Sequence, residues 1–331
     1  MNNKQISVIL HGGAGRFSEK YTPNKLPFLK QALDAAWDAL TAGRTGGIAV
    51  TQALKVMEEC EFFNAGYGGY PNANGIVLLD IGLMRGNRDF ISLLNLRRVK
   101  VPSAVAYDML ERHSNLMSVW THELMLELEA APEFIKQRYG YVARHEDLLA
   151  PYVLELLKDK NAAEVAQDGG THGTVGCVVR DADGNLFAGT STGGVNLKYN
   201  GRIGDTPIIG QGVFADNEIG ALSTTGHGES LMLSCLSGFI LAEMRARIRK
   251  NKYVFSEDPS SLSDLLAAEM REMSRKTSNG GAIVIIPNSG LPQYAFNSEM
   301  VSIALRSGSA EKINLEECCI ALSSGDKITS N

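Results

Sequence analysis

Thr174 is the residue of this chain whose type and surroundings point most directly to chemistry. It follows a glycine-rich run at 168–173 and precedes an apolar run at 175–179 that predicts a buried strand. A chain cut before Thr174 would give that residue both a hydroxyl nucleophile and a free α-amine. The pKa of an α-amine is about 7.7–8.0, close to the pH at which a general base works best. One residue would then hold the nucleophile and its activator.

A predicted hairpin brings a second hydroxyl to Thr174. Another apolar run at 186–189 leads toward Thr192, and an Asp-Gly step lies between the two runs. Asp-Gly between strand-like runs is a hairpin signal, and antiparallel pairing would place Thr192 beside Thr174. Taken alone, Thr174 is better explained as a structural residue, because threonine is common in strands.

The segment 201–207 places one cation and one anion three residues apart, at Arg202 and Asp205. An α-amino acid presents the opposite charges, and the guanidinium fork suits its carboxylate. The glycines of the segment allow close approach of the backbone to a ligand. A surface salt bridge between Arg202 and Asp205 is the alternative explanation of the same residues.

Small donor-rich residues at 223–230 precede a periodic apolar stretch at 231–244 that predicts a helix. Free N–H groups at a helix N-terminus favour an anion, which in acyl transfer would be the tetrahedral oxyanion. An ordinary capped helix start or a phosphate site is the alternative. No Gly-Lys-Ser/Thr step supports a nucleotide loop.

Several segments together resemble the plant-type asparaginase / isoaspartyl aminopeptidase family, whose members are N-terminal-nucleophile hydrolases that cleave their own precursor. The segments are His-Gly-Gly-Ala-Gly at 11–15, Phe-Asn-Ala-Gly-Tyr-Gly at 63–68, His-Gly-Thr-Val-Gly at 172–176, Thr-Ser-Thr-Gly-Gly at 190–194, Gly-Arg-Ile-Gly-Asp-Thr-Pro at 201–207, Ser-Thr-Thr-Gly-His-Gly-Glu at 223–229 and Gly-Gly-Ala-Ile at 280–283. Their order and number carry the resemblance.

The resemblance implies a catalytic set. Thr174 is the nucleophile, and autocleavage of the Gly173–Thr174 bond exposes its α-amine. Thr192 hydrogen-bonds the nucleophile and assists its activation. The remaining members are Thr225 and Gly226, which form the oxyanion hole, and Asn64, which lies beside the nucleophile.

The resemblance also implies how substrate is held. Arg202 binds the α-carboxylate, while Asp205 and the backbone carbonyl of Gly228 bind the α-ammonium. The substrates are the side-chain amide of L-asparagine, β-aspartyl (isoaspartyl) dipeptides, or both, and the product is L-aspartate. No organic cofactor is expected.

A monovalent cation is a further implication. The stretch 57–67 resembles a loop that wraps sodium, or in some members potassium, with backbone carbonyls. The carbonyls implied are those of Met57, Glu58, Cys60, Phe63, Ala65 and Tyr67.

The resemblance fades between residues 89 and 161. Arg85 also follows Met84 where the family usually has aspartate. These departures leave substrate preference and the subunit interface open. Two alternatives remain: a glycosylasparaginase-like or taspase-like hydrolase of the same fold, which usually places aspartate where this chain has Gly173, and an unprocessed homologue that acts as a binding protein.

Composition describes an ordinary globular chain. It has 331 residues, of which 44% are hydrophobic and 21% charged, with a net charge of −5. That charge argues against nucleic-acid binding. The five cysteines lack metal spacing and predict a reducing compartment. With no signal-peptide pattern and no apolar run of about 18 residues, we expect a cytoplasmic protein without a membrane span.

The predicted fold class is α+β. Strands are expected at 6–10, 76–79, 175–179, 186–189, 282–286 and 301–305, and helices at 27–42, 48–60, 104–129, 148–158, 230–249 and 261–273. The family resemblance, rather than periodicity, implies their arrangement as a four-layer α-β-β-α sandwich. It also implies one hydrolase domain, 1–331, cleaved into 1–173 and 174–331, and a dimer of these αβ units. A linker-like segment, 158–171, precedes the cleavage site.

Overall fold

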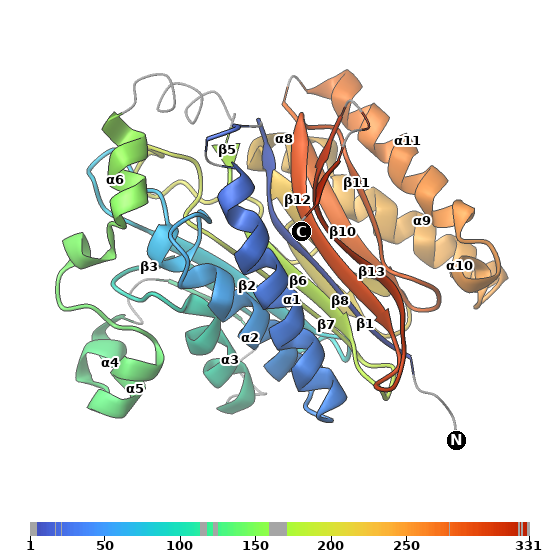
Figure 1. Cartoon of the computed structure of the whole chain (residues 1–331), viewed down its shortest axis with the longest axis horizontal. Helices are drawn as coiled ribbons and strands as arrows, with labels where there is room; N and C mark the ends of the chain where they lie inside the picture. The colour runs from blue at the N-terminus through green and yellow to red at the C-terminus, as the bar shows by residue number, and fades with distance from the viewer. Residues whose placement is uncertain are drawn as a thin grey trace.

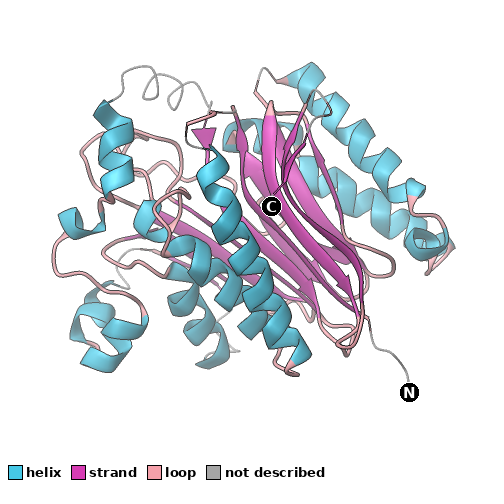
Figure 2. Cartoon of the chain, in the orientation of Figure 1, coloured by secondary structure: helices cyan, strands magenta, loops and turns pink. Residues whose placement is uncertain are grey.

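The computed structural model describes residues 5–16, 18–20, 22–112, 118–121, 125–158, 171–277, 279–323, 325 and 327–329. Two β-sheets lie face to face, and helices cover the outer face of each sheet (Figure 1). Coloured by secondary structure, the molecule shows four successive layers (Figure 2). The α-β-β-α sandwich expected from the family resemblance is confirmed.

The larger sheet contains ten strands within the described residues. Their order is β14-β13-β12-β1-β6-β7-β2-β3-β4, and β5 pairs with β1. The bounds are β1 Ile6–Gly15, β2 Leu79–Arg85, β3 Phe90–Leu96, β4 Ser118–Trp120, β5 Thr171–His172, β6 Val175–Arg180, β7 Leu186–Thr192, β12 Met300–Gly308, β13 Ile313–Leu322 and β14 Lys327–Thr329. Every residue of β1, β6 and β7 is buried, which places these strands at the centre of the sandwich.

The smaller sheet has the order β11-β10-β9-β8 in the described part of the chain. Its bounds are β8 Val213–Asp216, β9 Gly220–Gly226, β10 Gly281–Pro287 and β11 Gln293–Phe296. Alternation along the strands divides side chains between layers. Ile9 and Val178 pack between the sheets, whereas Val8 and Leu10 pack against the helices.

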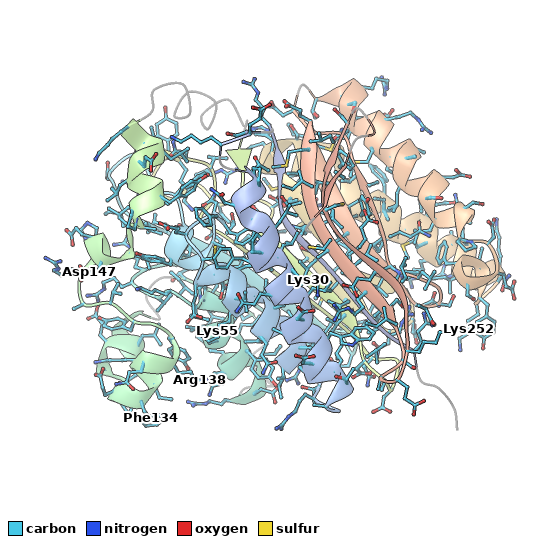
Figure 3. All side chains as sticks on the ribbon, in the orientation of Figure 1. Lys30, Lys55, Phe134, Arg138, Asp147 and Lys252 are labelled. Atoms are coloured by element: carbon cyan, nitrogen blue, oxygen red, sulfur yellow. The ribbon has the colours of Figure 1, made fainter. Side chains whose placement is uncertain are left out.

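Helices α1 Leu26–Thr41, α2 Gly46–Glu58 and α3 Pro102–Arg112 cover the larger sheet, and α9 Leu236–Lys250 and α11 Ser260–Lys276 cover the smaller one. The apolar stripe of α1 faces the sheet, as its 3–4 spacing predicts. Lys30 and Lys55 mark the opposite, charged faces of α1 and α2 (Figure 3). The shorter helices are α4 Met125–Ala130, α5 Glu133–Arg138, α6 Pro151–Lys158, α8 Gly228–Ser234 and α10 Val254–Glu257.

Most predicted strands are confirmed, by β1, β6, β7, β10 and β12. The strand expected at 76–79 is wrong, because β2 begins only at Leu79. The single helix expected at 104–129 is also wrong, because α3 ends at Arg112 and β4 follows it. The helix expected at 230–249 is interrupted at Cys235, whose φ of 50° ends α8 before α9 begins.

Three further expectations concern the linker, the cleavage into two fragments and the membrane. Residues 159–170, most of the predicted linker, lie outside the described residues. The division into 1–173 and 174–331 stays a prediction. Among the helices of the described ranges, none combines the length and the apolarity needed to cross a membrane.

Candidate active site

Thr174 and Thr192 meet at one end of a confirmed hairpin. Strands β6 and β7 are antiparallel, with Val175 opposite Ser191. One residue further along, the side-chain oxygens of Thr174 and Thr192 lie 3.0 Å apart. Both residues are buried, so this hydroxyl pair is fixed by the ladder behind it and shielded from bulk water.

Asn64 lies against the predicted cleavage site. A Cβ added to Gly173 would stand 2.7 Å from both the Cβ and the backbone nitrogen of Asn64. The Asn64 Oδ1 accepts from the N–H of Tyr70 at 2.8 Å, and its Nδ2 donates to the carbonyl of Gly194. Asn64 therefore joins its own loop to the chain just after Thr192, and it leaves no room for a side chain at residue 173.

His11 holds the carbonyl of the predicted nucleophile. Its Nδ1 lies 3.1 Å from the carbonyl oxygen of Thr174, and its Nε2 lies 2.8 Å from the hydroxyl of Ser223. A carbonyl only accepts, so Nδ1 carries the proton and Ser223 donates to Nε2. Burial lowers the pKa of His11 to about 3, so the ring is neutral at neutral pH. The bond to Ser223 links the larger sheet to β9 of the smaller one.

Thr225 and Gly226 end strand β9, where they pair with Ala282 and Gly281 of β10. The helix expected to follow this segment starts at Gly228, two residues after Gly226, so the N-terminus predicted within 223–230 is confirmed. Alternation along β9 puts Thr225 on the same face as Ser223, which meets His11. Within the described residues, the buried hydroxyl of Thr225 has no hydrogen-bond partner. The Thr225 hydroxyl is therefore an available donor on the face of β9 that carries Ser223 and meets His11, the residue that contacts Thr174.

Arg202 pairs with Glu229 rather than with Asp205. Its Nε donates to one Glu229 oxygen at 2.9 Å, and its Nη2 donates to the other at 2.7 Å. Gly228 lies between the two predicted anchors, because a Cβ there would stand 2.7 Å from Asp205 Oδ1 and 3.2 Å from Arg202 Nη2. The salt bridge considered as an alternative from the sequence is thus formed with a different carboxylate.

Asp205 is a buried carboxyl whose oxygen accepts from the hydroxyl of Thr224 at 3.0 Å. Burial raises its pKa to about 6, although the Thr224 hydrogen bond and the charge of Arg202 both lower it. A carboxylate in this position is stabilised by any cation brought next to it. The pair Arg202 and Asp205 can therefore receive one anionic and one cationic group.

Sequence patterns did not assign roles to Ser223, Thr190 and Glu229. The hydroxyl of Thr190 lies 2.6 Å from that of Ser223. Strand alternation could have found this contact, since each residue stands two positions before a predicted site threonine. Glu229 belongs to a predicted motif, but nothing in its spacing marks it as the partner of Arg202.

Backbone carbonyls converge in the loop predicted to hold a cation. A Cβ added to Gly68 would collide with the carbonyl oxygens of Cys60, Glu61 and Phe63. A Cβ added to Gly66 would collide with those of Glu58 and Lys100. These neutral oxygens, grouped at two neighbouring glycines, are of the kind that a hard monovalent cation takes as ligands. Three of the six predicted carbonyls, those of Glu58, Cys60 and Phe63, are among these oxygens.

The sequence also matches a known family model, described as Asparaginase, over residues 4–314. The chain belongs to this family. The match includes every residue of the site described above. Its extent also covers the 89–161 stretch, where the motif resemblance fades.

Relatives of the chain agree with the family assignment. The chain is 37% identical over 320 residues to a probable isoaspartyl peptidase/L-asparaginase of Drosophila melanogaster, covering 89% of this chain and 90% of that protein. It is 33% identical over 303 residues to an isoaspartyl peptidase/L-asparaginase of Danio rerio, with 90% and 91% covered. A plant-type L-asparaginase of Pyrobaculum calidifontis is 36% identical over 247 residues, with 70% and 77% covered.

Proposed function

We propose that this asparaginase-family chain is an autoprocessing threonine hydrolase. It removes the side-chain amide of L-asparagine, cleaves the β-linked bond of β-aspartyl dipeptides, or does both, and it releases L-aspartate. The names of the relatives support the reaction class. The single observation that carries the proposal is the buried Thr174–Thr192 hydroxyl pair at 3.0 Å, next to a glycine that has no room for a side chain.

Maturation uses the same hydroxyl. The oxygen of Thr174 attacks the carbonyl carbon of Gly173, and the acyl group passes from nitrogen to oxygen to give an ester. This shift frees the α-amine, and water then hydrolyses the ester, which restores the Thr174 hydroxyl and leaves a carboxylate on Gly173. Strand β1 of fragment 1–173 is hydrogen-bonded between β6 and β12, which both belong to fragment 174–331. These ladders support continued association of the two fragments.

In the mature enzyme, the α-amine of Thr174 takes the proton from its own hydroxyl, which attacks the substrate amide carbonyl. The Thr225 hydroxyl and the Gly226 N–H donate to the oxyanion that forms. Ammonia or an amino acid leaves, and water then hydrolyses the acyl-enzyme. The unpartnered hydroxyl of Thr225 supports this role.

Recognition rests on charge. Arg202 binds the α-carboxylate, and Asp205 with the carbonyl of Gly228 binds the α-ammonium. The buried position of Asp205 supports the assignment, because a cationic ligand would offset the cost of ionising it. The half-buried fork between Arg202 and Glu229 supports it further, because it fixes the guanidinium in place.

We also propose that sodium or potassium binds the 57–67 loop through backbone carbonyls and stiffens the loop that carries Asn64. The oxygens that converge at Gly66 and Gly68 support this site. The Met57 and Ala65 carbonyls already accept from the N–H groups of Cys60 and Gly68, and each retains a second lone pair.

We propose a dimer of cleaved αβ units in a reducing, cytoplasmic setting. Exposed Leu233 and Phe239, on α8 and α9, support burial of this side of the molecule against a second copy. All five cysteines are thiols, four of them buried, and this supports the reducing setting. Light scattering on the cleaved protein tests the assembly.

The reaction is tested by incubating the purified chain with L-asparagine, with β-aspartyl-leucine and with its α-linked isomer, and by measuring the L-aspartate released. We expect release from at least one of the first two substrates and none from the isomer. The Thr174→Ala variant should release none from any of them. A fully cleaved wild-type protein that is inactive on both β-amides would contradict the proposal.

A further inference from the structure

A second charged pair, outside the steps proposed above, lies beside the threonine pair. The side chains of Asp80 and Lys198 are both completely buried, with Lys198 Nζ 3.3 Å from Asp80 Oδ2. The ammonium also donates to the carbonyl of Leu78 at 3.0 Å. Because both groups lose their hydration, a buried ion pair contributes little net stability. Its position in the fold suggests a different contribution.

Asp80 is the partner of Thr192 in the ladder between β2 and β7. Residues directly opposite in an antiparallel pair project to the same face, with Cβ atoms about 4.5–5.5 Å apart. The second oxygen of Asp80 accepts from the N–H of Asn95 at 2.8 Å, which fixes the carboxylate. A rigid anion therefore stands alongside Thr192 and holds the lysine in place.

Lys198 packs directly on Gly194. A Cβ added to Gly194 would stand 2.9 Å from both Cδ and Nζ of the lysine. Gly194 has a φ of 79°, which L side chains rarely adopt, so the lysine fills the space that glycine leaves. The N–H of Gly194 donates to Thr192 Oγ1 at 3.0 Å, and its carbonyl accepts from Asn64. One residue thus connects the lysine to both neighbours of the nucleophile.

The hydrogen bond from Gly194 sets the direction of the next one. Because Thr192 Oγ1 accepts the Gly194 N–H, its own proton is free to be donated to Thr174 Oγ1. As the Thr174 proton passes to the α-amine, negative charge gathers on Thr174 Oγ1, and donation from Thr192 stabilises it. Chains of hydrogen bonds that run in one direction strengthen one another.

We propose that Lys198 and Asp80 are positioning residues that hold Gly194, and through it Thr192, in the geometry that activates Thr174. The inference rests on the proposed function and deepens it. It assigns the ion pair to the reaction step, not to substrate binding. Loss of the pair should therefore lower kcat and the rate of chain cleavage while leaving KM nearly unchanged.

The test uses Lys198→Met, Asp80→Asn and the double variant Asp80→Asn/Lys198→Met in the full chain. The double variant matters because it leaves no unpaired charge in the interior, so we expect it to fold. Arg306→Met is the matched control, since Arg306, like Lys198, is a buried cation that pairs with carboxylates, here those of Asp34 and Glu316. Melting temperatures verify folding, mass spectrometry gives the rate of cleavage, and kcat and KM for L-asparagine are expressed per cleaved chain.

We expect the double variant to lose about 10²-fold in kcat, with KM within about threefold of wild type, because small misplacements of reacting groups cost that much. A folded double variant that fails to cleave would also support the inference, because the same hydroxyls act in maturation. Arg306→Met should lower only the melting temperature. If the double variant keeps the wild-type kcat per cleaved chain, the inference about Lys198 and Asp80 is overturned and the proposed function stands. If the wild-type chain neither cleaves nor hydrolyses substrate, both the inference and the proposed function are overturned.

Discussion

The two ends of the site are built from different interactions. At the nucleophile end, Thr174, Thr192 and Ser223 are uncharged hydroxyls carried by strands or their immediate continuation, and they are joined by short hydrogen bonds to one another or to His11. At the anchor end, Arg202 and Asp205 are charged and lie in the loop between β7 and β8. In the proposed reaction, the nucleophile end fixes the geometry of attack, and the anchor end selects the substrate by charge.

This difference implies that substitutions at the two ends should affect different measured quantities. Changes at the nucleophile end should affect maturation and kcat, because the proposed self-cleavage and the proposed hydrolysis both use those hydroxyls. Changes at the anchor end should affect KM and leave maturation intact, because the chain's own Gly173–Thr174 bond presents no α-carboxylate or α-ammonium to bind.

The largest effect is expected from Thr174→Ala. Without the hydroxyl there is no attack on Gly173 and no acyl-enzyme, so both cleavage and hydrolysis should be lost entirely. Electrophoresis and a coupled aspartate assay measure the two outcomes. Normal cleavage of this variant would place the nucleophile elsewhere and remove the contrast between the two ends.

Arg202→Ala should raise KM for L-asparagine by about 10²-fold, because charge-assisted hydrogen bonds contribute roughly 1.5–3 kcal/mol each. The rate of chain cleavage should stay within about twofold of wild type. Arg275→Ala is the control, since Arg275 forms a comparable bond with Glu272 on the exposed face of α11. A block in maturation with Arg202→Ala would show that the two ends are not independent.

Asp205→Asn should weaken binding while strengthening the fold. The pKa of Asp205 is raised from 3.8 to about 6, so the folded protein binds the proton more tightly than the unfolded chain does. Stability is therefore lost as the pH rises from about 4 to about 6, by about 3 kcal/mol at most. At pH 7.5 the asparagine variant should melt higher than wild type, and kcat/KM should fall by about 10²-fold.

The pH dependence separates this effect from a general change in packing. At pH 4 the wild-type carboxyl is protonated when folded, so the difference in melting temperature should shrink. Protonation of the Thr174 α-amine should lower kcat/KM of both proteins below about pH 8. Below about pH 6 the kcat/KM of the wild type should fall more steeply than that of Asp205→Asn, because the neutral Asp205 acid attracts an ammonium poorly. If Asp205→Asn were less stable than wild type at pH 7.5, this result would contradict the conclusion that burying the Asp205 carboxylate costs stability.

Gly173→Ala tests the contact between the scissile bond and Asn64 at the nucleophile end. We expect the smallest effect from this substitution. Its methyl group collides with Asn64, so the scissile bond must shift and cleavage should slow by roughly tenfold. Time courses followed by mass spectrometry measure this rate. Cleavage at the wild-type rate would show that the Asn64 contact does not hold the scissile bond.

The nucleophile end could be predicted from sequence more fully than the anchor end. The hairpin that brings Thr192 to Thr174 follows from two apolar runs and an Asp-Gly turn, all within 19 residues. The bond between Arg202 and Glu229 joins residues 27 positions apart on different elements, and the Lys198–Asp80 pair spans 118 positions. No local pattern specifies such partners.

Strand β9 shows a second limit of local patterns. Its sequence, Gly-Ala-Leu-Ser-Thr-Thr-Gly, is small and polar, and it predicts a loop that leads into a helix. In the folded chain it is a fully buried strand, because β8 and β10 pair with its edges and the larger sheet covers one face. Small side chains there let the two sheets approach and leave space for His11 to reach Ser223.

Cleavage before Thr174 is tested most directly by the mass of the purified protein, followed over days at neutral pH. We expect the 35.7 kDa chain to give way to two fragments that meet between Gly173 and Thr174, in step with the appearance of L-aspartate-releasing activity. A folded chain that stays intact, or activity that appears without cleavage, would contradict Thr174 as an N-terminal nucleophile.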